Sequence, residues 1–125
     1  MKFVGEAGLR LTNAGQNVER ALKELSPHYR RLKHDGKDVI LDLSEATARI
    51  RVNSDDIWVR VEATDLPLCQ GTKMLIEGTL YALADDMDPE ILWVEGREVP
   101  FAALRAHMIA TADAASHPGS DNDRR

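Results

Sequence analysis

Cysteine is almost absent from this sequence of 125 residues, and the single thiol of Cys69 excludes an internal disulfide or a zinc site built from several cysteines. No apolar run approaches the roughly 20 residues that a membrane-spanning helix needs. Acidic residues outnumber basic ones, and the formal net charge of −5 argues against a nucleic-acid partner. Charges at Lys2 and Glu6 interrupt the N-terminus before a signal peptide can develop, so we expect a cytoplasmic protein that binds no membrane.

Motifs for nucleotide binding, metal binding or nucleophilic catalysis are also missing. The chain has no Walker loop, dinucleotide fingerprint, nucleophile elbow or paired catalytic carboxylates. His28 and His34 flank a basic segment, residues 28–37, that we expect to be mobile and solvated, and the acidic loop 85–90 lacks the glycine of a calcium-binding loop. A buried structural role is expected for Cys69. We therefore expect no cofactor and no metal, and an enzyme is the least favoured class.

Alternation of apolar and polar residues is the clearest positive signal. It predicts three strands, each with one apolar and one polar face, over residues 39–43, 48–52 and 57–63. A weaker alternation predicts a first strand at residues 3–9, and a short strand is expected at 91–95. Two short polar connections join the three central strands and suit hairpins, which favours an antiparallel sheet.

Helical spacing of apolar residues predicts an amphipathic helix over residues 14–25 and a longer one that follows the capping residue Asp65 and ends near residue 84. Pro100 favours the start of a last helix. The apolar stripe of that helix would consist of Phe101, Leu104, Met108 and Ala112. From Ser116 onward the residues are too polar to bury, so a disordered tail is expected at 116–125.

The order of the predicted elements indicates an α+β fold in one domain, residues 1–115. Its core is β-α-β-β-β-α, an antiparallel sheet covered on one face by helices, with a short strand and a C-terminal helix added. The helix through Ala21-Leu22-Lys23-Glu24-Leu25, the three strands and the long helix after Asp65 resemble a family of small uncharacterised bacterial domains. Some members occur beside or fused to siderophore-interacting flavoproteins. The resemblance covers residues 3–84 and implies no catalytic residues.

The polar face of the sheet is the first candidate binding surface. If Leu43 pairs with Ala48, and Val52 with Ile57, two rows of neighbours result across the strands. The rows are Ile40–Arg51–Trp58 and Asp42–Arg49–Arg60, with Glu62 diagonal to Arg49. The like charges of the second row must be offset by Asp42 and Glu62 or by a bound anion. An aromatic ring among arginines is typical of docking surfaces, and the alternative is a solvated face of cross-strand ion pairs.

The long helix provides the second candidate surface. Gly71 and Gly78 lie seven residues apart on the flank that also carries Met74, and each glycine costs a helix about 1 kcal/mol relative to alanine. Such a pair indicates that another backbone packs closely, and an intrachain helix is favoured over a homodimer seam. We therefore expect a non-catalytic interaction domain that self-associates or docks a protein partner. The alternative is a protein that binds a small anionic ligand, linked to iron or siderophores as the resemblance implies.

Overall fold

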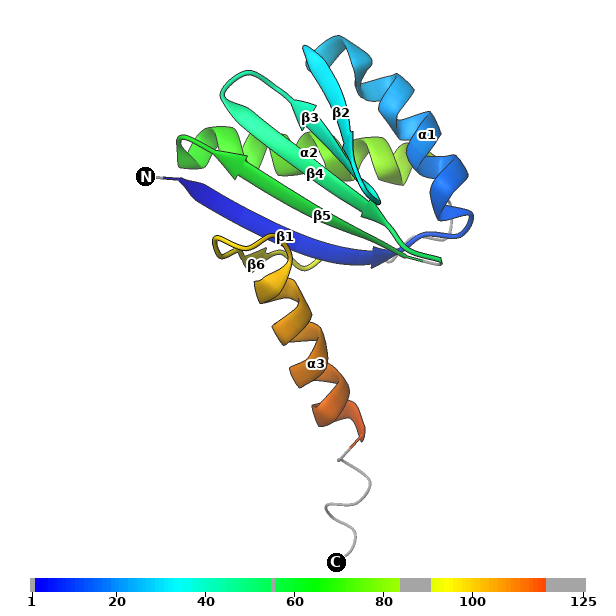
Figure 1. The fold of residues 1–125 in the computed structure, drawn as a ribbon, viewed down its shortest axis with the longest axis vertical. Coiled ribbons are helices and arrows are strands. Elements are labelled where there is room, and N and C mark those ends of the chain that lie inside the picture. Colours follow the sequence, from blue (N-terminus) through cyan, green and yellow to red (C-terminus); the bar gives the residue numbers. More distant parts are fainter. Residues whose placement is uncertain (1, 55, 84–90, 117–125) are drawn as a thin grey trace, which may run out of the picture.

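The computed structural model describes residues 2–54, 56–83 and 91–116, and within them the chain forms one antiparallel sheet with three α-helices (Figure 1). The strand order across the sheet is β2-β3-β4-β5-β1-β6. The strands are β1 (Phe3–Arg10), β2 (Arg31–Asp35), β3 (Asp38–Asp42), β4 (Ala46–Val52), β5 (Asp56–Ala63) and β6 (Val94–Glu95). The helices are α1 (Ala14–Leu25), α2 (Leu66–Leu83) and α3 (Ala102–Ser116), and a single 3-10 turn at Ser26–His28 follows α1. The α+β class is thereby confirmed.

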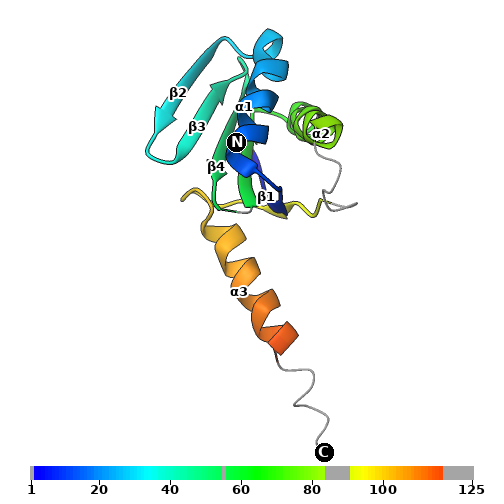
Figure 2. The ribbon, with the colours of Figure 1, turned by 90° about the vertical axis from the view of Figure 1, so that its right-hand side faces the viewer.

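One face of the sheet carries the apolar core, and α1 and α2 cover it (Figure 2). Alternate residues of the central strands, such as Ile50, Val59 and Val61, point into this core and are almost completely buried. The sequence predicted α1 at its observed bounds and α2 within one residue of its C-terminal end. Asp65 caps α2, because its Oδ1 accepts a hydrogen bond from the backbone N–H of Leu68 at 2.8 Å.

Two strand predictions are corrected. Residues 31–35 were expected in a mobile loop, but they form β2, the edge strand beside β3. Leu32 is the only apolar residue of this strand, so its sequence lacks the alternation that marks its neighbours. The strand expected at 91–95 is shorter and consists of Val94–Glu95 alone.

The β3–β4 register differs by two residues from the one predicted. Leu41, not Leu43, pairs with Ala48, so that Ile40 lies opposite Arg49. Ser44 is the cause, because it adopts a left-handed φ of 79° and donates its backbone N–H to Asp42 Oδ1 at 3.0 Å. A shift of two preserves the faces of the strand. The β4–β5 register was predicted correctly, with Val52 opposite Ile57.

The C-terminal helix α3 begins on the opposite face of the sheet and projects away from the domain (Figures 1 and 2). Phe101 and Leu104 are buried, whereas every residue from Arg105 to Ala112 is exposed. The predicted stripe is therefore buried at its N-terminal end, Met108 lies beside Gly8 of β1 and is 37% exposed, and Ala112 is exposed. Ser116 lies in α3 rather than in a tail, and residues 117–125 lie outside the described residues. No helix of the described part is long and apolar enough to span a membrane.

Candidate interaction surfaces

Asp38, the first residue of β3, binds two arginines of the outer sheet face. Its carboxylate accepts hydrogen bonds from Arg51 Nε at 2.6 Å, from Arg51 Nη2 at 3.0 Å and from Arg49 Nη1 at 2.5 Å. The side chain of Asp38 is 2% exposed, and those of Arg49 and Arg51 are 22% and 26% exposed. Burial alone would raise the pKa of Asp38, but the hydrogen bonds from the two arginines outweigh it and hold that pKa below its usual range.

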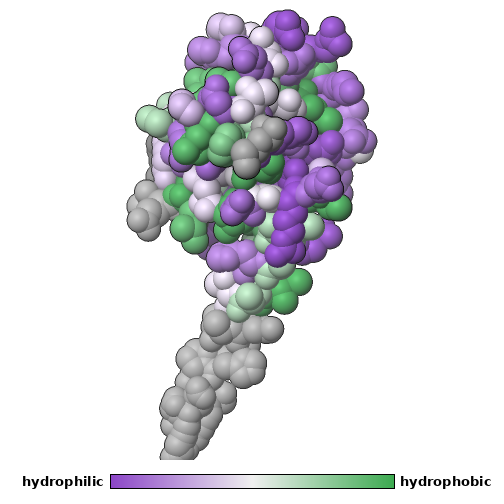
Figure 3. All heavy atoms as spheres, turned by 90° about the vertical axis from the view of Figure 1, so that its left-hand side faces the viewer, coloured by the Kyte–Doolittle hydropathy of each residue, from purple (hydrophilic) through white to green (hydrophobic). Residues whose placement is uncertain are grey.

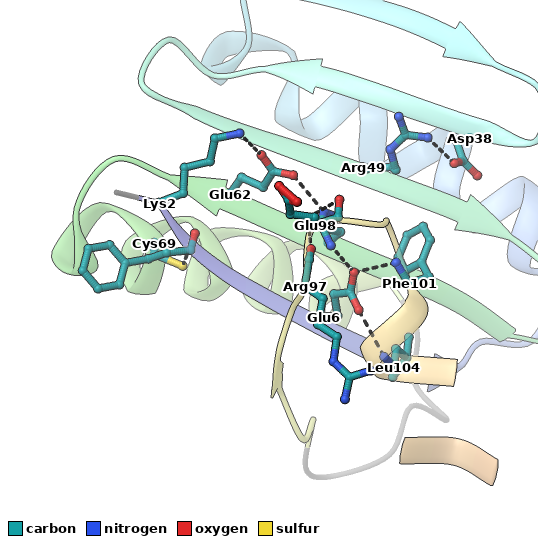
Figure 4. Close-up of polar contacts among 12 residues, drawn as sticks. Lys2, Glu6, Asp38, Arg49, Glu62, Cys69, Arg97, Glu98, Phe101 and Leu104 are labelled. Atoms are coloured by element: carbon teal, nitrogen blue, oxygen red, sulfur yellow. Dashed lines mark hydrogen bonds and ion pairs between the residues drawn. The ribbon is translucent and has the colours of Figure 1, made fainter. Parts of the chain in front are cut away.

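A second cluster of charges lies deeper, around Arg60, whose partners Glu6, Glu62 and Arg97 are labelled in Figure 4. Arg60 is 3% exposed and binds Glu6, which is fully buried, through Nη1 at 2.5 Å. Its Nε donates to Glu62 Oε2 at 2.8 Å, and its Nη2 donates to the carbonyl of Arg97. Burial raises the pKa of Glu62, and hydrogen bonds from Arg60 and Lys2 lower it further than burial raises it. Arg60 is thus a buried structural cation.

Glu6 also fixes the start of α3. Its carboxylate accepts hydrogen bonds from the backbone N–H of Phe101 at 2.6 Å and of Leu104 at 3.1 Å (Figure 4). It thereby provides acceptors for N–H groups that have no partner within the first turn of a helix. Phe101 has a φ of 67°, a conformation that costs a bulky residue about 1–3 kcal/mol. The fully buried Phe101 ring and the Glu6 contact offset this cost.

Trp58 sits where α3 meets the sheet. Its ring centroid lies 5.6 Å from that of Phe101, and the guanidinium carbons of Arg51 and Arg105 lie 6.0 Å and 5.4 Å from the Trp58 ring. The predicted Arg51–Trp58 pair is therefore confirmed. Trp58 Nε1 is buried and has no hydrogen-bond partner within the described residues. Trp58 is half-buried by this chain's own α3 rather than presented to solvent.

The five outer-face residues singled out from the sequence do share one face, but they are not one open site. The predicted Arg49–Arg60 neighbours are confirmed, whereas their expected counter-ion Asp42 pairs with Arg30 at 3.5 Å. All three arginines of the set already hold carboxylates. Ile40 is half-buried and lines a separate hollow of about 190 Å³ with Arg31 and Lys33.

The outward face of α2 differs in kind from the outer sheet face. Its exposed residues carry no charge, and they are Leu66, Pro67, Gln70, Gly71, Met74, Gly78, Tyr81 and Ala82. On the neighbouring helix α1 the exposed residues include Glu19, Arg20, Lys23 and Glu24. A solvated helix normally carries charge on its outward side, as α1 does. The part of this uncharged face that carries Gly71, Met74, Gly78 and Ala82 is called the glycine flank below.

The two charged residues of α2 are turned away from the glycine flank. Glu77 Oε2 accepts a hydrogen bond from Trp93 Nε1 at 2.5 Å, and Lys73 Nζ lies 5.3 Å from the Trp93 ring centroid. Both side chains are half-buried. Gly5 makes room for Lys73, because a Cβ at Gly5 would lie 2.4 Å from Lys73 Cε. Trp93, which precedes β6, thus contacts both charged side chains of α2.

The glycine flank borders a groove between α2 and α1. The groove has a volume of about 410 Å³ and is lined by Glu24, Met74, Leu75, Gly78, Thr79, Ala82 and Leu83. Met74 is 69% exposed, and a Cβ at Gly71 or at Gly78 would meet no atom within 4 Å. The intrachain helix expected against the two glycines is therefore wrong for the described residues. Among the described residues, nothing covers the space in front of the two glycines.

Other predicted candidates play no role in these surfaces. Cys69 is 1% exposed and lies 3.7 Å from the carbonyl of Phe3, and burial raises the pKa of its thiol. His28 and His34 are exposed, and no group of metal-binding residues occurs within the part of the chain that the structure covers. The acidic loop 85–90 lies outside the described residues.

Sequence reasoning placed Phe101 on the apolar stripe of the last helix but missed Glu6, and together these two residues decide where α3 begins. A glutamate between Gly5 and Ala7, in a strand whose other charged residue is the terminal Arg10, is the one signal of a buried carboxylate. Its partners lie 54 and 95 residues along the chain, so sequence spacing gives no indication of them.

Comparison with known proteins supports the fold alone. No family model matches the chain, and no curated protein matches it. The structure is similar to the NMR structure of PA4090 from Pseudomonas aeruginosa, with a TM-score of 0.61 and 15% sequence identity. The similarity covers 74% of this chain and 95% of that one. The α+β architecture is therefore shared with a solved protein, and the binding surfaces have to be judged from this chain's own residues.

Proposed function

We propose that this protein is a non-catalytic interaction domain that self-associates through the outward face of α2. The observation that carries this function is the absence of charge from every exposed residue of α2, beside an α1 whose exposed side is rich in charge. Exposed apolar surface next to a groove is typical of a protein–protein contact. Carboxylates already engage Arg49, Arg51 and Arg60, so we do not extend the proposed function to an anionic ligand.

The two glycines make this face suited to a helix or backbone that approaches closely. Each costs α2 about 1 kcal/mol relative to alanine, and no atom of the described chain occupies the space in front of Gly71 or Gly78. Glycine at a helix–helix contact lets the axes approach to about 8 Å, the near end of the usual range. Met74 beside them provides a flexible apolar side chain that adapts to a partner surface.

The test is sedimentation velocity of the wild type over a range of concentrations, compared with two variants. Met74→Lys places a charge on the glycine flank at a side chain that is 69% exposed, so the fold is retained. Gln16→Lys adds the same charge at an exposed position of α1 and is the matched control. We expect a dimer for the wild type and for Gln16→Lys, and weakening by about 30-fold or more for Met74→Lys. A monomeric wild type, or a Met74→Lys protein that dimerises normally, would refute the proposed function.

The glycines provide a second, independent readout. Gly71→Ala with Gly78→Ala is expected to stabilise the isolated domain by about 1–2 kcal/mol, because both glycines sit in open helical positions. The same variant is expected to weaken the dimer, since the added methyl groups enter the contact. Gly15→Ala on α1, where a Cβ also meets nothing within 4 Å, should stabilise the domain without affecting association. Equal dimer affinity in both variants would count against the glycine flank.

A further inference from the structure

We infer that α3 of a second copy occupies the groove beside the glycine flank, so that two chains exchange their C-terminal helices. This inference rests on the proposed self-association and names the element that makes the contact. Within the described residues, α3 carries an exposed, uncharged stretch at 106–112, and no helix fills the groove beside the glycine flank. Docking of one in the other would cover both.

The projecting part of α3 is poorly suited to solvent. Residues 106–112 read Ala-His-Met-Ile-Ala-Thr-Ala, all are exposed, and none is acidic, lysine or arginine. Ile109 is 59% exposed, whereas Met108 is 37% exposed and lies beside Gly8 of β1. In Figure 3 this part of α3 appears pale to green directly above the grey atoms. A helix of this length has little stability in water unless one side packs against something.

The helix α3 has no route to the groove of its own chain. Phe101 and Leu104 hold its first turn on the outer face of the sheet, where Glu6 accepts both of their backbone hydrogen bonds. The groove lies on the opposite side, between α1 and α2. Covering the groove with the same chain's α3 would require breaking the buried Glu6 contacts. Only another molecule's α3 can reach it while that anchor stays formed.

The uncharged stretch of α3 fits within the length of the glycine flank. Gly71 and Ala82 are eleven positions apart on α2, roughly 16 Å, and the uncharged stretch 106–112 of α3 spans six positions, roughly 9 Å. Arg105 and Asp113 bound this stretch, and Glu24 is the one charged residue among the described residues that line the groove. The small side chains of α3, such as Ala106 and Ala110, suit a close approach to glycine.

Other symmetric contacts between two copies leave one of these surfaces uncovered. An α2–α2 seam would hide the glycine flank but leave Ile109 in water, and an α3–α3 seam would do the reverse. If the α3 of each chain docks in the groove of the other, both surfaces of both chains are buried. The assembly is then complete at two chains, as twofold symmetry requires.

A disulfide-trapping experiment separates the three arrangements. One chain carries Ala82→Cys, in the groove, and an isotope-labelled second chain carries Ala112→Cys, one helical turn beyond Ile109 on the same side of α3. Native Cys69 is retained because it is buried. The chains are mixed, allowed to exchange and oxidised with diamide, and the disulfide-linked pairs are identified by mass spectrometry.

We expect the mixed Ala82→Cys/Ala112→Cys pair to exceed the half share that random pairing would give, and the two like pairs to be minor. Dominance of Ala82→Cys pairs would indicate an α2–α2 seam and overturn the exchange while leaving the proposed function standing. Dominance of Ala112→Cys pairs, or a random mixture, would also overturn it. As a second measurement, Ile109→Lys should weaken the dimer by about 30-fold or more, as Met74→Lys does. A normal dimer from Ile109→Lys with a monomer from Met74→Lys refutes the exchange alone, and a monomeric wild type refutes both.

Discussion

Replacing Glu6 should release the start of α3 from the sheet. Glu6 is fully buried, and its carboxylate holds Arg60 and the backbone N–H groups of Phe101 and Leu104. Truncation of Glu6 to alanine leaves the Arg60 side chain, which is 3% exposed, with Glu62 as its remaining carboxylate partner. Loss of one member of a buried ion pair costs about 3–5 kcal/mol, and each orphaned amide adds about 1 kcal/mol. Because a domain has only about 5–15 kcal/mol in total, Glu6→Ala is expected to be close to unfolding.

The isosteric Glu6→Gln variant keeps the experiment interpretable. Its side-chain oxygen still accepts a hydrogen bond, but the negative charge opposite Arg60 is lost, so we expect a loss of about 2–3 kcal/mol in the free energy of unfolding. Urea denaturation followed by circular dichroism measures this loss. Hydrogen exchange at the Leu104 amide reports the anchor directly, and its protection should fall. Glu6→Gln with Arg60→Met should cost less than the sum of the two single changes, since the two residues form one unit.

The matched control for this anchor is Glu62→Gln. Its side chain is 26% exposed, so water can replace much of what Arg60 loses, and the expected cost is about 1 kcal/mol. Glu6→Gln within 0.5 kcal/mol of the wild type, with unchanged exchange at Leu104, would refute the structural role assigned to Glu6.

Two more predictions concern the sheet. Asp38 has a lower pKa folded than unfolded, so stability is complete above the unfolded pKa of roughly 4 and falls as the pH drops through the folded pKa. Asp38→Asn should flatten that acid slope in urea titrations, and an unchanged slope would contradict the Arg49–Asp38–Arg51 cluster. A Cβ at Gly96 would clash with Val4 Cγ1. Gly96→Ala should therefore lower the melting temperature, with a loss of about 1–3 kcal/mol in the free energy of unfolding. An unchanged melting temperature would contradict the packing of residue 96 on β1.

The sequence predicted a structural feature correctly where the residues that determine it lie close together along the chain. Apolar spacing was sufficient for α1, and the four-residue connection after Val52 was sufficient to set the β4–β5 register, where Asn53 donates to the carbonyl of Asp56 at 2.9 Å. The same counting failed between β3 and β4, because the left-handed Ser44 tightens that turn and counting residues does not reveal it.

The same difference between neighbouring and distant residues applies to the candidate surfaces. Composition identified Gly71 and Gly78, since two glycines inside a helix are costly wherever the helix packs. Whether the space before them was filled depended on the placement of α1 and α3, which long-range contacts decide. The arginines of the outer face were recognised as neighbours, yet the buried partner of Arg60 is Glu6 on β1, 54 residues away along the chain, and local spacing does not reveal that pairing.

The most direct test of the central claim is hydroxyl-radical footprinting of the wild type across a dilution series. Met74 is 69% exposed and Leu92 is 68% exposed in the single chain, and only Met74 lies on the glycine flank. If the chain self-associates through α2, oxidation of Met74 should slow as the protein concentration rises, while oxidation of Leu92 stays constant. Met74 oxidation that is fast and independent of concentration would show that α2 remains uncovered and would contradict the proposed function.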